Sequence, residues 1–154
     1  FFDEPTVGID PQSRNNILDF IREIAQNGAT VIFTTHHLEE AESLCERIAI
    51  MDHGKMLAQG SVEELAKIVG DGDIVTIRGA FSAAQFKNKF QDTGVGFINV
   101  NDNDATVSLP PSGLNISALM QQLSEAEMDV HDLSIQKPSL ESVFLKLTGR
   151  ALRD

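Results

Sequence analysis

The chain has 154 residues, 42% of them hydrophobic, and a formal net charge of −11 at pH 7. A chain of this size and composition can bury a hydrophobic core as one ordinary domain or as two small ones. The acidic charge argues against a general nucleic-acid binder, because such a protein attracts phosphates with a surplus of Lys and Arg. The single cysteine, Cys45, allows neither an internal disulfide nor a Cys-rich metal site, and it favours a reducing, cytosolic environment. No apolar run approaches the roughly 18 residues of a membrane span, so we expect no direct insertion into a membrane.

The first half of the sequence predicts strands and helices in alternation. The two phenylalanines at 1–2 end an apolar strand. Asp10 followed by Pro11 is typical of a helix start, with an acidic cap and a proline at the first helical position. Apolar residues then recur at helical spacing over 17–25. The next apolar segment, "ATVIFTT" at 29–35, is continuous rather than alternating, which predicts a parallel strand buried on both faces.

A second helix, a hairpin and a short helix are expected next. The helix is predicted over 38–46, and the segment 47–60 predicts a hairpin with its turn at "DHG". Ser61 and Glu64 form a capping box for a helix over 62–69. The first half therefore predicts a mixed α/β architecture.

The glycine-rich stretch "GDGD" at 70–73 breaks this pattern, and we place a domain boundary there, between 1–70 and 71–154. The second domain predicts the order strand, helix, strand, strand, helix, strand, followed by a final helix that Ser139 caps. The predicted segments are "DIVTIR", a helix with Phe86 and Phe90, "GFINV", "ATVSL", a helix over 116–123 and "DVHDLSI". This order indicates a small α+β, ferredoxin-like domain, an antiparallel sheet with helices on one face.

Two adjacent acids, Asp3 and Glu4, follow the first strand. The carboxyl ends of the strands in an open α/β sheet border the crevice where ligands bind. Successive side chains of a strand diverge, so the two acids cannot do one job together. One carboxylate can face a hydrated Mg²⁺ held by nucleotide phosphates, while the other orients or deprotonates an attacking water. The alternative is that both are solvated acids in the turn before Pro5.

Two stretches together resemble the nucleotide-binding subunit of an ABC transporter. They are "FFDEPTVGIDP" at 1–11 and "VIFTTHHLEEAE" at 31–42. In that family the apolar strand with Asp-Glu is the Walker B motif, "GIDP" is the D-loop, and the histidine after the next strand is the switch histidine. The resemblance covers about residues 1–69, and it implies the C-terminal part of a P-loop NTPase (RecA-like) core.

The resemblance implies a role for four residues. Asp3 resembles the aspartate that holds Mg²⁺ through water, and Glu4 resembles the general base that polarises the attacking water. Asp10 matches the D-loop aspartate, a cofactor-binding position that lies across the interface between two subunits. His36 matches the switch histidine, a catalytic residue that contacts the γ-phosphate. The implied cofactors are ATP and Mg²⁺.

The residues alone leave other interpretations open. Asp10 is a good N-cap whatever else it does. His36 and Glu40 have the spacing of a helical metal pair, but acids in a first helical turn also complement the positive end of the helix dipole. No role is assigned to His37, and Cys45 is expected to be a core residue rather than a reactive one.

Three motifs of that family are absent from these 154 residues. The chain has no P-loop, GxxxxGK[ST], whose backbone amides and lysine hold the phosphates. It also has neither the Ser-Gly-Gly signature segment nor the aromatic loop that stacks on adenine. We therefore expect the isolated chain to lack ATPase activity and to self-associate. We also expect four apolar side chains to be partly uncovered: Phe1, Phe2, Val31 and Phe33.

The end of the chain resembles a second known module. The stretch "QKPSLESVFLKLTGR" at 136–150 is similar to the end of an accessory domain that follows the ATPase core in some ABC exporter subunits. In those subunits the domain is thought to be regulatory or to assist subunit pairing. The alternative is that 71–154 only packs and stabilises.

Taken together, the resemblances imply an ATP-hydrolysing subunit of an ABC transporter of the exporter type. The expected partners are transmembrane permease subunits and a second ATPase subunit, as a homodimer, at the cytoplasmic face of the plasma membrane. Two alternatives stay open. One is a non-transport ATPase of the same class, and the other is a regulatory or binding module without activity of its own.

Overall fold

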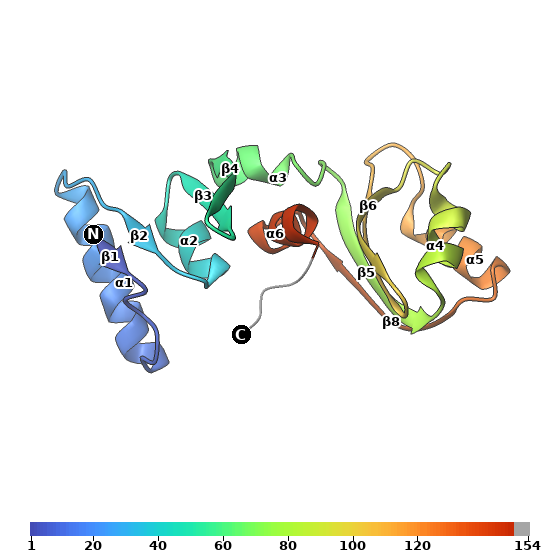
Figure 1. Ribbon diagram of the computed structural model, residues 1–154, viewed down its shortest axis with the longest axis horizontal. Coiled ribbons are helices and arrows are strands. Elements are labelled where there is room, and N and C mark those ends of the chain that lie inside the picture. The colour runs from blue at the N-terminus through green and yellow to red at the C-terminus, as the bar shows by residue number, and fades with distance from the viewer. Residues whose placement is uncertain (150–154) are drawn as a thin grey trace. The chain divides into compact units, whose positions relative to one another are not determined.

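The computed structural model of the protein describes residues 1–149, and Figure 1 shows its elements. Residues 150–154, which include the last residue of the "QKPSLESVFLKLTGR" motif, lie outside this range. The chain divides into two compact units, Phe1–Ile48 and the part from Ala49 onward. This division falls earlier in the chain than the proposed domain boundary at residue 70, which stays a prediction. Within the described part of the chain, no helix is long and apolar enough to cross a membrane.

The first unit contains two short strands and two helices. Strand β1 (Phe2–Asp3) pairs in parallel with β2 (Phe33–Thr34). Helix α1 (Pro11–Gln26) follows β1 in the chain, and α2 (Leu38–Leu44) follows β2. Because the two strands are parallel, the segments that leave their carboxyl ends start from the same edge of the ladder.

Helix α1 begins where the sequence predicts. The Asp10 side chain accepts hydrogen bonds from the backbone amides of Gln12, at 3.1 Å, and Ser13, at 3.0 Å, with the proline in the first turn. These bonds satisfy two of the amides that a helix start leaves without an intrahelical partner. The helix buries Leu18 and Ile21.

The strand predicted over 29–35 is shorter in the structure. Only Phe33 and Thr34 form strand β2, and Ile32 beside them is 58% exposed. Among residues 1–149, β1 and β2 have no further strand beside them, so the prediction of burial on both faces is wrong for this structure. The expected partial exposure is confirmed for all four of the apolar side chains: Phe1, Phe2, Val31 and Phe33.

A hairpin and a short helix come next. They comprise β3 (Ile48–Asp52), β4 (Lys55–Gly60) and α3 (Val62–Ala66). The two strands pair, and both His53 and Gly54 in the turn between them have positive φ, as tight hairpin turns require. The predicted capping box of α3 is present. The Ser61 amide donates to the Glu64 carboxylate at 2.9 Å, and the Glu64 amide donates to the Ser61 hydroxyl at 3.2 Å.

Four antiparallel strands form the main sheet, in the order β6-β7-β5-β8. In chain order the elements are β5 (Asp73–Ala80), α4 (Ala83–Phe90), β6 (Gly96–Asn101), β7 (Asp104–Leu109), α5 (Ile116–Glu125) and β8 (Asp129–Gln136). The sequence pattern predicts this succession of strands and helices. Both helices lie on the same side of the sheet in Figure 1.

The core of the second unit lies between this sheet and its two helices. Phe86 and Phe90 of α4 are fully buried, with ring centroids 4.8 Å apart. Leu119 and Leu123 of α5 are fully buried against the same cluster. Alternating residues of the two central strands complete it: Val75, Ile77, Ala105, Val107 and Leu109. Full burial of a large apolar side chain stabilises by about 1.5–3 kcal/mol, so this cluster holds the sheet and helices together.

The last helix, α6 (Leu140–Thr148), packs beside α3. Ser139 caps it, as the sequence predicts, and Leu140 is buried. The Lys146 ammonium donates a hydrogen bond to the Ile68 carbonyl at 2.7 Å. This bond joins α6 to the segment that follows α3.

Candidate functional site

The candidate site lies where β1 and β2 end in the first unit. Asp3 is the last residue of β1, and Glu4 follows it directly. On the neighbouring strand, Thr34 is the last residue, and His36 lies two positions further along the chain. Parallel pairing places Asp3 opposite Thr34, so the two acids and the histidine leave the ladder at one edge.

Asp3 is exposed and bound by the neighbouring strand. Its Oδ1 accepts a hydrogen bond from the Thr34 hydroxyl. This contact orients the carboxylate and leaves its second oxygen available to a ligand. Mg²⁺ keeps several waters and binds through one or two carboxylates together with substrate phosphates. An exposed, oriented carboxylate therefore fits the Mg²⁺ role that the resemblance implies.

Glu4 and His36 are in direct contact. The Glu4 Oε2 and His36 Nδ1 atoms are 2.9 Å apart, within hydrogen-bond distance. The Glu4 and His36 side chains are 38% and 46% exposed, so water and a ligand can reach both. The sequence placed these two residues at the ends of neighbouring strands without showing that they touch.

The backbone at Glu4 adopts a conformation that is uncommon for this residue type. Its φ is +47°, in the left-handed region, which few residues other than glycine adopt. The Glu4 amide donates to the Thr34 carbonyl and to the Thr34 hydroxyl, both at 3.1 Å. Such conformations cost on the order of 1–3 kcal/mol and cluster at functional sites, where the surrounding contacts maintain them. Here the bonds from the Glu4 amide to Thr34 hold the turn that brings the Glu4 carboxylate to His36.

Asp10 acts as the cap of α1, which is the alternative that its sequence position left open. Hydrogen bonds from the Ser13 side chain and backbone hold the pKa of Asp10 below its usual value. The side chain is exposed, so it remains accessible to a partner as well.

His36 and Glu40 do not form a metal pair. Glu40 is buried and accepts hydrogen bonds from the Thr6 and Thr35 hydroxyls at 3.0 and 2.9 Å. Residues 1–149 contain no cluster of three or more His, Cys, Asp or Glu side chains that could hold a metal ion. The interpretation of Glu40 as an acid that only complements the helix dipole is incomplete, because its carboxylate points into the unit.

Sequence reasoning missed this buried carboxylate. A usable signal was present, because Glu40 lies four residues before Leu44 and so shares one face of α2 with an apolar residue. Cys45, the C-cap residue of this helix, is half-buried rather than part of the core, and burial raises the pKa of its thiol. A raised pKa keeps the thiol protonated, in agreement with the expectation of an unreactive residue.

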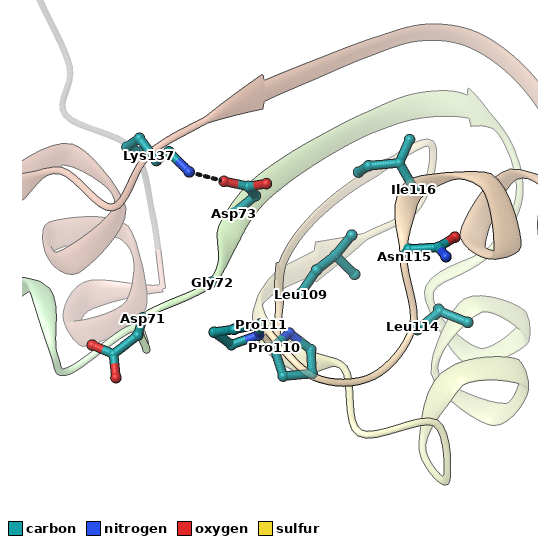
Figure 2. Close-up of a pocket in the computed structure, with 10 residues that line it drawn as sticks. All are labelled: Asp71, Gly72, Asp73, Leu109, Pro110, Pro111, Leu114, Asn115, Ile116 and Lys137. Carbon is teal, nitrogen blue, oxygen red and sulfur yellow. Dashed lines mark hydrogen bonds and ion pairs between the residues drawn. The ribbon is translucent and has the colours of Figure 1, made fainter.

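The second unit contains a shallow pocket of about 250 Å³, shown in Figure 2. In the figure Lys137 points toward Asp73, and its ammonium lies 2.6 Å from the carboxylate. Asn115 caps α5 by accepting a hydrogen bond from the Ala118 amide at 2.9 Å. These polar groups bind neighbouring parts of the same unit rather than converging on the pocket. The pocket therefore gives no support to the alternative of a binding module.

Comparisons with known proteins find ATP-binding proteins among the relatives of this chain. Residues 1–42 match a family described as "AAA domain, putative AbiEii toxin, Type IV TA system". The linearmycin resistance ATP-binding protein LnrL of Bacillus subtilis is 36% identical, over 99% of this chain and 50% of that protein. The daunorubicin/doxorubicin resistance ATP-binding protein DrrA of Streptomyces peucetius is 35% identical, over 100% of this chain and 47% of that protein.

A human relative extends the similarity to a much longer protein. ATP-binding cassette sub-family A member 2 of Homo sapiens is 29% identical over 97% of this chain, which covers 6% of that protein. The homologues of this chain are therefore ATP-binding proteins of the ABC transporter class, as the sequence resemblance predicts. The chain spans about half the length of the bacterial relatives.

Proposed function

We propose that this chain is part of an ATP-hydrolysing subunit of an ABC transporter of the exporter type. The observation that carries the proposal is the contact between Glu4 and His36 at the carboxyl ends of two parallel strands. Homology to ATP-binding proteins along the whole chain supports it. In this proposal residues 1–70 belong to the ATPase core, and 71–154 form a ferredoxin-like accessory domain.

In the proposed reaction Glu4 acts as the general base. Its carboxylate orients a water molecule and accepts a proton as the water oxygen attacks the γ-phosphorus of ATP and the bond to the β-phosphate bridging oxygen breaks. His36 holds the Glu4 carboxylate through Nδ1, and its ring offers a second nitrogen to the γ-phosphate. Asp3 would hold Mg²⁺ through water, and the metal would supply positive charge that neutralises the phosphates.

The partners follow from the same proposal. A second ATPase subunit would meet this one near Asp10, which is exposed at the start of α1. Transmembrane permease subunits would anchor the pair at the cytoplasmic face of the plasma membrane. The names of the bacterial relatives, which refer to linearmycin, daunorubicin and doxorubicin resistance, support export of drug-like molecules.

The experiment is phosphate release by the full-length protein, assembled with its permease. We expect turnover with ATP and Mg²⁺, and loss of turnover when EDTA removes the metal. Glu23→Gln, which neutralises an exposed acid on α1, is the matched control and should leave the rate unchanged. A full-length protein that releases no phosphate in the presence of Mg²⁺ would overturn the proposal.

A further inference from the structure

Glu40 is the most deeply buried ionisable side chain of the first unit, with 5% of its surface exposed. A carboxylate in such a position is costly unless hydrogen bonds and an opposite charge compensate for the water it has lost. The residues around Glu40 supply both, and they come from three different segments of the unit.

Two hydroxyls bind the same carboxylate oxygen. Thr6, which is fully buried in the turn after β1, donates to Glu40 Oε2 at 3.0 Å. Thr35, in the segment after β2, donates to this oxygen at 2.9 Å. Hydrogen bonds to a charged group are stronger than those between neutral groups. The Glu40 carboxylate therefore ties the segments that follow both strands to α2.

Arg14 of α1 provides the opposite charge. Its Nε lies 3.5 Å from Glu40 Oε1 in an ion pair. Both atoms are buried, and neither has a hydrogen-bond partner in the described part of the chain. The guanidinium also lies 3.5 Å from His37 Nε2 through Nη2. The ion pair of the Glu40 carboxylate with Arg14 thus links α2 to α1 as well.

These contacts lie next to both Glu4 and His36, the candidate catalytic pair. Thr6 follows Glu4 by two residues, and Thr35 directly precedes His36. The Thr35 hydroxyl also accepts a hydrogen bond from the His37 amide at 3.0 Å, which constrains the backbone on the far side of His36. A shift of the Glu40 carboxylate would therefore move both segments that carry the pair.

We propose that Glu40 is a positioning residue that sets the distance between Glu4 and His36 by binding Thr6 and Thr35 on the two segments that carry them. This inference rests on the proposed function of Glu4 and His36. Glu40 itself lies inside the unit and acts through the two threonines. It differs in this from Glu39 of the same helix, which is exposed.

The sharpest test is a matched pair of variants at Thr6. Thr6→Val keeps the shape and removes the hydroxyl, whereas Thr6→Ser keeps the hydroxyl and removes the methyl group. In the full-length protein we expect Thr6→Val to lower kcat by about tenfold with an unchanged KM for ATP, because small misplacements of reacting groups can cost up to about a hundredfold. Thr6→Ser should keep the kcat of the wild type.

A second readout does not depend on activity. Nitrogen-15 chemical shifts of the His36 ring, measured at one pH in the full-length protein, report its contact with Glu4. We expect them to change in Thr6→Val and in Glu40→Gln, and to stay constant in Thr6→Ser. Glu39→Gln, on the exposed side of the same helix, is the control for a general loss of charge and should move neither the shifts nor kcat.

The outcomes separate this inference from the function on which it rests. If wild-type protein hydrolyses ATP but Thr6→Val and Thr6→Ser lose activity to the same extent, Thr6 only packs and the inference is wrong. Unchanged kcat and unchanged His36 shifts in folded Glu40→Gln would also overturn it. If the wild-type protein shows no hydrolysis, the proposed function fails, and the His36 shifts alone decide whether Glu40 positions the pair.

Discussion

The two units of the chain differ in the side chains that they bury, although helix α1 of the first unit also buries Leu18 and Ile21. In the second unit Phe86 and Leu119 are fully buried, and ion pairs such as that of Lys137 with Asp73 lie at the surface. In the first unit the Glu40 carboxylate is buried, whereas Phe1 is 80% exposed. Apolar packing therefore stabilises the second unit. Hydrogen bonds and an ion pair stabilise the part of the first unit that carries the candidate site.

The largest effect is expected in the core of the second unit. Phe86→Ala should lower the free energy of unfolding by about 3–5 kcal/mol, because it removes a ring that is packed on all sides. The control, Phe1→Ala, should change it by less than about 0.5 kcal/mol, as expected of an exposed position. Urea unfolding followed by circular dichroism measures both. Equal losses of unfolding free energy in the two variants would contradict the difference described between the units.

A smaller effect is expected at the capping box of α3. Ser61→Ala removes the hydroxyl that accepts from the Glu64 amide, and it should cost about 1 kcal/mol of stability. Ser124→Ala, at an exposed position inside α5, is the control and should not destabilise, since alanine is the better helix former. Urea unfolding distinguishes the two variants, and an unchanged midpoint for Ser61→Ala would contradict the assigned role of the cap.

The smallest expected effect is a pH dependence of the stability of helix α1 in the first unit. It arises at the cap of this helix, Asp10, and we expect it in the first unit only. The pKa of Asp10 is lowered in the folded protein from the ordinary value of 3.8. Its contribution to stability is therefore fully present above that value and is lost as the pH falls through the lowered folded pKa. Hydrogen exchange of the Gln12 and Ser13 amides across this acid range measures the loss. Asp10→Asn still caps the helix but does not titrate, so its profile should be flat, and a wild-type profile equally flat would contradict the assignment.

Much of the fold could be predicted because local signals determine it. Asp10, Ser61 and Ser139 cap helices where the sequence predicts, and the hairpin turns at His53 and Gly54. Helix ends were less predictable. Helix α2 ends at Leu44 rather than at residue 46, and α3 ends at Ala66 rather than at residue 69, because fraying at helix ends depends on packing that the sequence pattern does not contain.

The candidate site was predictable in its residue types but not in its contacts. The acids at the end of the first strand and the histidine after the second follow from motif and spacing. The positive φ of Glu4, its contact with His36 and the burial of Glu40 depend on how two strands and two helices meet in space. The strand over 29–35 was overestimated for a related reason, since the apolar pattern indicates the capacity for burial and not the presence of neighbouring strands.

The central claim is that Glu4 is the general base of an ATP-hydrolysing site, and Glu4→Gln in the full-length protein tests it most directly. The amide keeps the shape of the side chain but cannot accept the proton of the attacking water, so phosphate release should fall by about 10²–10⁴-fold. ATP binding, measured by equilibrium dialysis with radiolabelled nucleotide, should be retained. Undiminished phosphate release by this variant would contradict the account.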